Sequence, residues 1–155
     1  MVDLGIARAL HVLCIVLWIG GVAMVTLIVI PKVLREGGTF EQFEAFEHRF
    51  ARQSRFTVLL AGLSGFYMVW RLELWERFAE LRFWWMGAMF AIWLIFSVML
   101  YVVEPFVLRR TFRHHGGAHA AATMRRMQTM HRVLLAASLV TIAGAVAGSH
   151  GLITL

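Results

Sequence analysis

The sequence predicts an all-α fold, an integral membrane four-helix bundle with both termini on the outer (periplasmic) side. Composition is the first observation: apolar residues make up 60% of the 155 residues and charged residues 15%, and the mean hydropathy is +0.72. These values lie far outside the range of soluble domains. The second observation is that runs without Asp, Glu, Lys or Arg reach the length of a helical crossing in three places. The third is that the apolar–polar alternation of a membrane β-barrel does not occur.

We expect a single transmembrane domain over 1–155, with spans at about 8–32, 54–72, 83–106 and 130–152. The second apolar run, 56–70, is short. Phe43, Phe46 and Phe50 precede it at helical spacing, so we expect one long helix that begins amphipathic at the interface and then becomes apolar. The first apolar run lacks a basic leader and a small-residue cleavage site, and is expected to remain in the mature protein.

Basic residues predict the orientation of the bundle. Most of them lie between spans one and two and in the stretch 109–126, which is interpreted as a basic loop between spans three and four. The opposite side carries few arginines, and acidic residues lie among them. These arginines are Arg8, Arg71, Arg77 and Arg82. Because positive charges resist translocation, both termini are expected to face outward from a bacterial inner (cytoplasmic) membrane. Basic loops beside the anionic lipid bilayer explain the net charge of +6, so nucleic acid is not an expected partner.

Two histidines form the candidate site. His11 lies about one turn inside the outer end of span one, and His150 lies close to the outer end of span four. Since span one runs inward and span four runs outward, the two imidazoles are expected at similar depths near the same membrane face. Ionisable groups in hydrocarbon are costly and usually mark a partner or a function. His11 and His150 are therefore the candidate metal ligands.

Haem b fits such a pair, because imidazole is a common axial ligand and helical bundles commonly hold cofactors in their interior. Small residues in spans two and four would leave room for the macrocycle, Trp18 shares the helical face of His11, and Arg8 and Arg71 would meet the propionates at the outer boundary. The alternative is structural. Small residues also mediate close helix packing, arginines also reach lipid headgroups, and the histidines would then be hydrogen-bonded between helices.

The stretch ALHVLCIVLWIGGVAMVTLIVIPKVL, residues 9–34, resembles the first helix of the CopD-like and HemJ-like membrane proteins. The later parts follow a similar order, with an amphipathic segment before span two and RFWWMG opening span three. The resemblance implies a four-helix haem b protein, since HemJ-like proteins are haem-associated protoporphyrinogen oxidases with an important histidine that maps onto His11. That family also relies on a lysine near the start of span three, where residues 83–87 read FWWMG. This departure weakens the oxidase assignment, and Met86 there is either an axial ligand or simple packing.

The expected function is that of a membrane-bound b-type haem protein in electron transfer or oxidoreduction, with a quinone, a porphyrin or a periplasmic redox protein as partner. One alternative is a HemJ-like protoporphyrinogen oxidase, and another is a CopD-like copper-handling protein, for which Met124, Met127 and His131 share a helical face. A non-catalytic membrane subunit and a homo-oligomer stay open. Glu104, at the inner end of span three, is expected to pair with an arginine such as Arg132.

Overall fold

The computed structural model describes residues 2–36, 40–108 and 118–151. These residues are almost entirely helical, and none of them lies in a β-strand, which confirms the predicted all-α class. In chain order the elements are α1 (Val2–Met24), η1 (Val25–Val29), α2 (Ile30–Glu36), α3 (Phe40–Arg71), η2 (Leu74–Ala79), η3 (Leu81–Phe83), α4 (Trp84–Val98), η4 (Met99–Leu108) and α6 (Ala118–Ser149).

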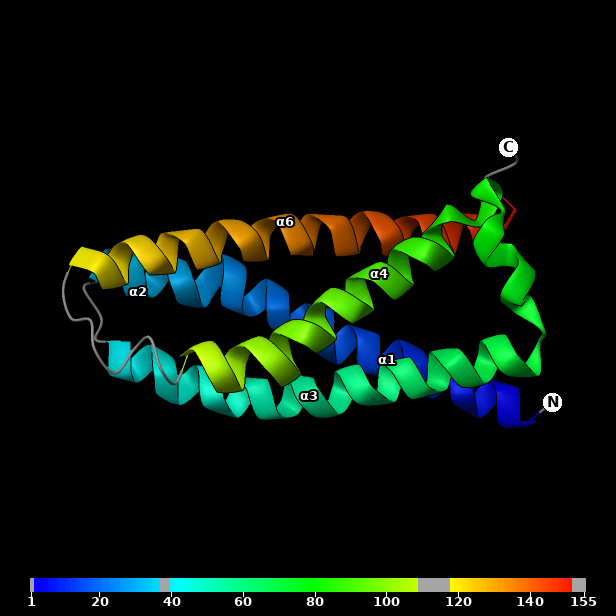
Figure 1. The fold of residues 1–155 in the computed structure, drawn as a ribbon, viewed down its shortest axis with the longest axis horizontal. Helices are drawn as coiled ribbons and strands as arrows, with labels where there is room; N and C mark the ends of the chain where they lie inside the picture. The colour runs from blue at the N-terminus through cyan, green and yellow to red at the C-terminus, as the bar shows by residue number, and fades with distance from the viewer. Residues whose placement is uncertain (1, 37–39, 109–117, 152–155) are drawn as a thin grey trace.

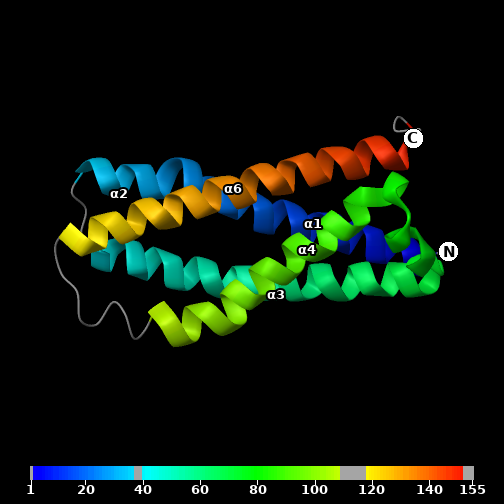
Figure 2. The same cartoon turned by 45° about the horizontal axis from the view of Figure 1, so that its top comes forward.

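These elements form four long helical segments that run back and forth along the long axis of the molecule (Figure 1). The N- and C-termini lie at the same end, together with the connection that holds η2 and η3. We call this the outer end, because the charge distribution predicts that it faces the periplasm. The most extensive packing is between α1 and α3 and between α4 and α6. Helix α4 crosses the bundle diagonally, from α3 near the inner end to α6 near the outer end (Figures 1 and 2).

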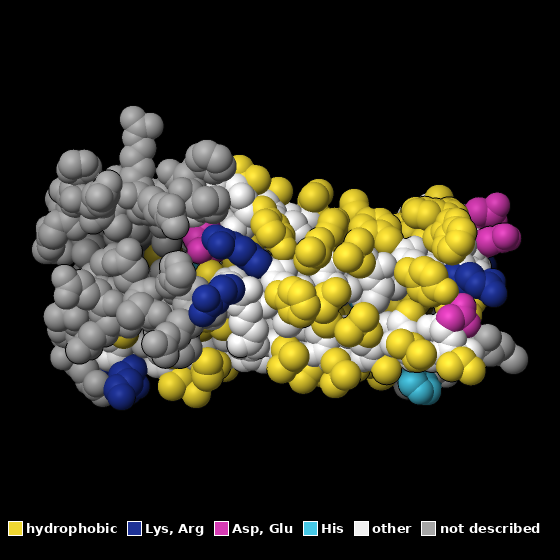
Figure 3. Space-filling view, turned by 90° about the horizontal axis from the view of Figure 1, so that it is seen from below, with side chains coloured by type: hydrophobic (Ala, Val, Ile, Leu, Met, Phe, Trp, Pro, Cys, Tyr) yellow, Lys and Arg dark blue, Asp and Glu magenta, His cyan; other side chains and the backbone are white. Residues whose placement is uncertain are grey.

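Three helical segments are long and apolar enough to cross a membrane: Val2–Arg35, Leu81–Glu104 and Arg125–Ser149. Helix α3 is not one of the three, because its apolar run is bounded by Arg55 and Arg71. On the face seen in Figure 3, apolar side chains fill the stretch between charged groups at the outer end and charged groups toward the inner end. Such a surface fits a lipid bilayer, whose hydrocarbon core is about 30 Å thick.

The helix boundaries confirm one sequence prediction and correct another. Helix α3 is one continuous helix from Phe40 to Arg71, as the phenylalanine spacing predicts. The prediction of a loop over 109–126 is wrong for its second half, since α6 begins at Ala118. Residues 118–127 read AHAAATMRRM, and alanine, methionine and arginine are among the strongest helix formers. The first half, 109–117, lies outside the described residues.

Both prolines of the chain are associated with π-helical turns. Pro31 follows η1 almost directly, and Pro105 lies within η4. Proline has no N–H and clashes with the preceding turn of an α-helix, so a wider turn accommodates it. In a π-turn the residue at position 105 would donate to the carbonyl of Leu100. The Nε of Arg55 makes this hydrogen bond instead, over 3.1 Å.

The same arginine confirms the prediction that Glu104 pairs with an arginine of the inner side. The Nη2 of Arg55 lies 2.9 Å from Oε1 of Glu104, and Tyr101 donates its hydroxyl to the carbonyl of Arg55 over 2.7 Å. The arginine is Arg55 of α3, and not Arg132 of α6, which was the example named from the sequence. The reason is the diagonal course of α4, whose inner end lies beside α3. This cluster connects α3 with η4, the continuation of α4, in the inner half.

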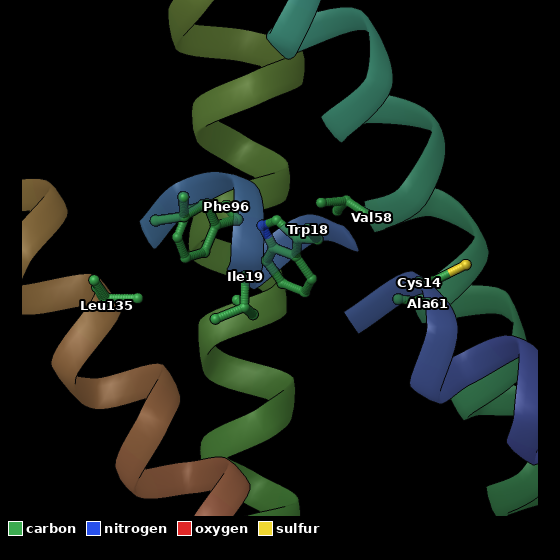
Figure 4. Packing of buried hydrophobic residues seen from close by; sticks show 8 residues of the cluster. Cys14, Trp18, Ile19, Val58, Ala61, Phe96 and Leu135 are labelled. Atoms are coloured by element: carbon green, nitrogen blue, oxygen red, sulfur yellow. The ribbon is translucent and has the colours of Figure 1, made fainter. Parts of the chain in front are cut away.

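The core of the bundle surrounds Trp18. Its ring meets the ring of Phe96 edge to face, with centroids 5.0 Å apart, and Cys14, Val58 and Leu135 belong to the same buried cluster (Figure 4). The thiol of Cys14 is free and buried there, as a small core residue. Small α3 residues recur at helical spacing on the buried side, and they let α1 approach closely: Ala51, Ser54, Val58, Ala61 and Gly65.

Candidate functional site

A cavity of about 410 Å³ lies between the long helices in the outer half of the bundle. This volume is within the range of small-molecule sites in proteins. Its wall consists largely of aromatic and aliphatic side chains from α1, α3, α4 and α6, and η2 contributes to it near the outer end. Such a wall favours an apolar ligand body, and the few polar side chains would set its orientation.

The α1 side of the cavity confirms a face predicted from the sequence. Arg8, His11, Ile15 and Trp18 all line the cavity, at spacings of three and four residues. Trp18 is only 4% exposed and separates the cavity from the core cluster on its other side. From the outer end inward, a ligand would therefore meet a cation, an imidazole and then apolar surface.

The imidazole of His11 is held against α3. Its Nδ1 lies 2.9 Å from the carbonyl oxygen of Ala61 and 3.2 Å from Oγ of Ser64. Ser64 donates its own hydroxyl to the carbonyl of Leu60, over 2.6 Å. Gly65 leaves the space for the ring, because a Cβ at that position would come within 3.1 Å of Cε1 of His11. Local small residues on α3 thus fix the position of the ring.

These contacts also determine the tautomer. A carbonyl oxygen can only accept a hydrogen bond, so we infer that Nδ1 of His11 carries the proton and donates it to Ala61. The lone pair of the neutral ring is then on Nε2. Within the described parts of the chain, Nε2 of His11 makes no hydrogen bond, and this atom is not fully buried. Metal-binding histidines typically have this arrangement, with one ring nitrogen donating to a backbone carbonyl and the other facing the metal.

His150 lies at the outer end of the fourth long helical segment, directly after α6. It is exposed, and its Nδ1 lies 2.8 Å from the carbonyl of Val146 in the last turn of α6. It is not among the described residues that line the cavity, although Gly148 and Ser149 are. The structure therefore does not place His150 in the described cavity wall that contains His11. The physical reason is that His150 directly follows α6 and hydrogen-bonds a terminal carbonyl of that helix.

The arginines of the outer end also depart from the prediction. Arg8 lines the cavity, as expected, but Arg71 does not belong to the described lining. The Nε of Arg71 lies 3.6 Å from Oδ2 of Asp3, which also accepts a 2.9 Å hydrogen bond from Tyr67. The second arginine of the cavity wall is Arg77 of η2, with its guanidinium 4.7 Å from the ring centroid of Phe83.

Aromatic rings pack against several glycines of spans two and four. A Cβ at Gly62 would come within 2.6 Å of the indole of Trp93, and one at Gly144 within 2.6 Å of Trp84. Gly148 faces Trp85 in the same way. At these positions, small residues mediate close helix packing, which was the structural alternative, because a glycine leaves room for the ring of a neighbouring helix. The space for a ligand is the cavity that remains between the packed rings.

The described residues offer few ligands for the alternative of a copper-handling protein. The Nδ1 of His131 donates to the carbonyl of Met127 on its own helix, over 2.9 Å, and the side chain of Met124 lies outside the described part. Across residues 2–36, 40–108 and 118–151, no group of three or more His, Cys, Asp or Glu side chains is arranged to hold a metal ion. The cavity wall does contain the thioethers of Met86 and Met89, on α4.

No protein-family model, no curated protein and no solved structure matches this chain. The resemblance to CopD-like and HemJ-like proteins therefore stays a prediction from residues 9–34. The functional interpretation rests on the cavity and on the side chains in its wall.

Proposed function

We propose that this protein is a membrane-bound b-type haem protein that acts in electron transfer or oxidoreduction, with His11 as an axial ligand of the haem iron. The observation that carries the proposal is the hydrogen bond from Nδ1 of His11 to the carbonyl of Ala61. It leaves the lone pair of Nε2 on a ring that lines an apolar cavity. The same hydrogen bond orients the imidazole and raises its basicity as a ligand.

The residues of the cavity fit such a cofactor. A tetrapyrrole needs a largely apolar space between helices and only one or two axial ligands from the protein. A closed metal site needs three or more protein ligands. His150 lies outside the described cavity wall, so a second protein ligand would come from Met86 or Met89 on α4. When bound, the haem would supply one-electron chemistry, and a methionine ligand would raise its reduction potential.

The proposed topology has four crossings, with both termini in the periplasm and the protein in a bacterial inner membrane. Helix α3 lies along α1, which is long and apolar enough to cross, and the two helices pack closely. Both termini lie at one end of the molecule in Figure 1. The cavity then belongs to the periplasmic half of the membrane, within reach of a quinone, a porphyrin or a periplasmic redox protein.

Haem titration of the apoprotein in detergent tests the ligand assignment. We expect wild-type protein and His150→Ala to bind haem with the same oxidised and reduced spectra, and His11→Ala to lose the bound spectrum. Added imidazole should restore a bound spectrum to His11→Ala, because the substitution leaves a space at Gly65 and the acceptor at Ala61.

Three results would count against the proposal. The first is a wild-type protein that binds no haem. The second is a spectrum that survives in His11→Ala while circular dichroism shows the native helix content. The third is copper without iron in the wild-type protein as purified, which would favour the copper-handling alternative.

A further inference from the structure

The four arginines of the outer side fall into two groups. Two are paired with acids: Arg71 with Asp3 and Arg82 with Glu80. Arg8 and Arg77 differ, because neither makes an ion pair with any described carboxylate. These same two arginines line the cavity, and the two paired ones do not belong to its described wall. Their charges are thus available to a molecule in the cavity.

The two arginines reach the cavity from different elements. Arg8 precedes His11 by three residues, which is roughly 4.5 Å along the axis of α1 toward the outer end. Arg77 comes from η2, which the chain reaches through a left-handed turn at Glu73, with φ of 54°. The guanidinium of Arg77 stacks over the ring of Phe83, so its face is covered and its N–H edges can point elsewhere. Both cations are therefore on the outer side of the imidazole.

Reaching lipid headgroups would account for an arginine on the lipid-facing surface. Arg8 and Arg77 are also exposed, but they differ from such arginines because both line one apolar cavity, which they reach from separate elements. An apolar cavity with two cations toward its mouth complements an amphiphile whose flat apolar body enters the bundle and whose acidic groups stay at the outer end. Guanidinium and carboxylate groups form strong, often bidentate hydrogen bonds.

We propose that Arg8 and Arg77 form an acid-recognition site at the mouth of the cavity, which selects a porphyrin by its carboxylate side chains. This inference rests on the proposed haem function and deepens it by naming the groups that set ligand specificity. Arg77 takes the role that the sequence assigned to Arg71. The two propionates of haem b provide one acidic group for each arginine.

Affinity measurements with haem and with its dimethyl ester test this site, because esterification removes the acidic groups and keeps the ring. We expect wild-type protein to bind haem at least about tenfold more tightly than the ester, as expected when hydrogen bonds to charged groups are lost. Arg8→Gln and Arg77→Gln should each lower this preference, and the double variant should abolish it with little change in affinity for the ester. Arg82→Gln is the matched control, since Arg82 also lies over Phe83 but pairs with Glu80.

The outcomes separate this inference from the proposed function. Equal wild-type affinities for haem and ester would overturn the acid-recognition site and leave haem binding intact, and so would an equal loss of preference in Arg82→Gln. Failure to bind either compound would overturn both. Displacement of haem by a long-chain fatty acid, lost in the double variant, would retain the acid-recognition site but show that it does not select porphyrins.

Discussion

The polar cluster in the inner half of the bundle differs from the polar side chains in the wall of the outer cavity. In the inner half, Arg55 bonds the carboxylate of Glu104 and the carbonyl of Leu100, and Tyr101 bonds the carbonyl of Arg55. In the outer half, Arg8 and Arg77 line a cavity without a described carboxylate partner, and His11 uses one ring nitrogen of two.

This difference indicates which part of the bundle would bind a ligand. Polar groups within a membrane are costly unless they are satisfied, so the inner cluster is explained by the packing of α3 on α4. The outer groups converge on a space that the protein does not fill. We therefore expect substitutions in the inner half to change stability and those in the cavity wall to change ligand binding.

The largest expected effect on stability is at Trp18, which lies between the core and the cavity. Trp18→Ala should lower the free energy of unfolding by about 3–5 kcal/mol, because it removes a large side chain from contact with Phe96 and Ile19. Trp75→Ala is the control, since Trp75 is 53% exposed, and it should change stability little. Chemical unfolding in detergent measures both, and equal effects would show that Trp18 is not part of a packed boundary.

A smaller effect is expected from the inner cluster. Arg55→Met should destabilise the protein by about 1.5–3 kcal/mol, because the carboxylate of Glu104 and the carbonyl of Leu100 both lose a charged donor. Arg82→Met removes a more exposed ion pair and should cost less than about 1 kcal/mol. The wild-type haem spectrum should persist in Arg55→Met. A loss of haem there, with the helices intact, would mean that the two halves are coupled.

The smallest expected effect concerns the glycines. Gly62→Ala should destabilise the protein by at least about 1 kcal/mol, because the new Cβ would displace the ring of Trp93. In Gly87→Ala the new Cβ meets no described atom within 4 Å, so the variant should be neutral or stabilised by up to about 1 kcal/mol. Thermal unfolding of the two variants checks this difference, and a neutral Gly62→Ala would show that the indole adjusts freely.

Features that repeat along one helix were predictable from the sequence. The long helix α3 and the shared face of Arg8, His11 and Trp18 follow from spacing alone, because the helical period fixes which side chains lie together. The all-helical class followed from composition and the apolar runs. The four crossings and the orientation of the termini stay predictions.

Features that depend on helix ends and crossing angles were not predictable. Helical periodicity does not define the direction of His150, because this residue follows the last residue of α6. The left-handed turn at Glu73, which leads into η2 and Arg77, has no glycine to signal it. The pairing of Glu104 with Arg55 depends on the diagonal course of α4, which only the packing of all the helices determines.

The most direct test of the central claim is the haem content of the wild-type protein, purified in detergent from cells with an ample haem supply. Absorption spectra of the oxidised and reduced protein, with iron and copper assays on the same sample, give the result. The outer cavity with its His11 imidazole predicts an equimolar amount of b-type haem. A folded, helical protein with no haem spectrum and no iron would contradict the claim.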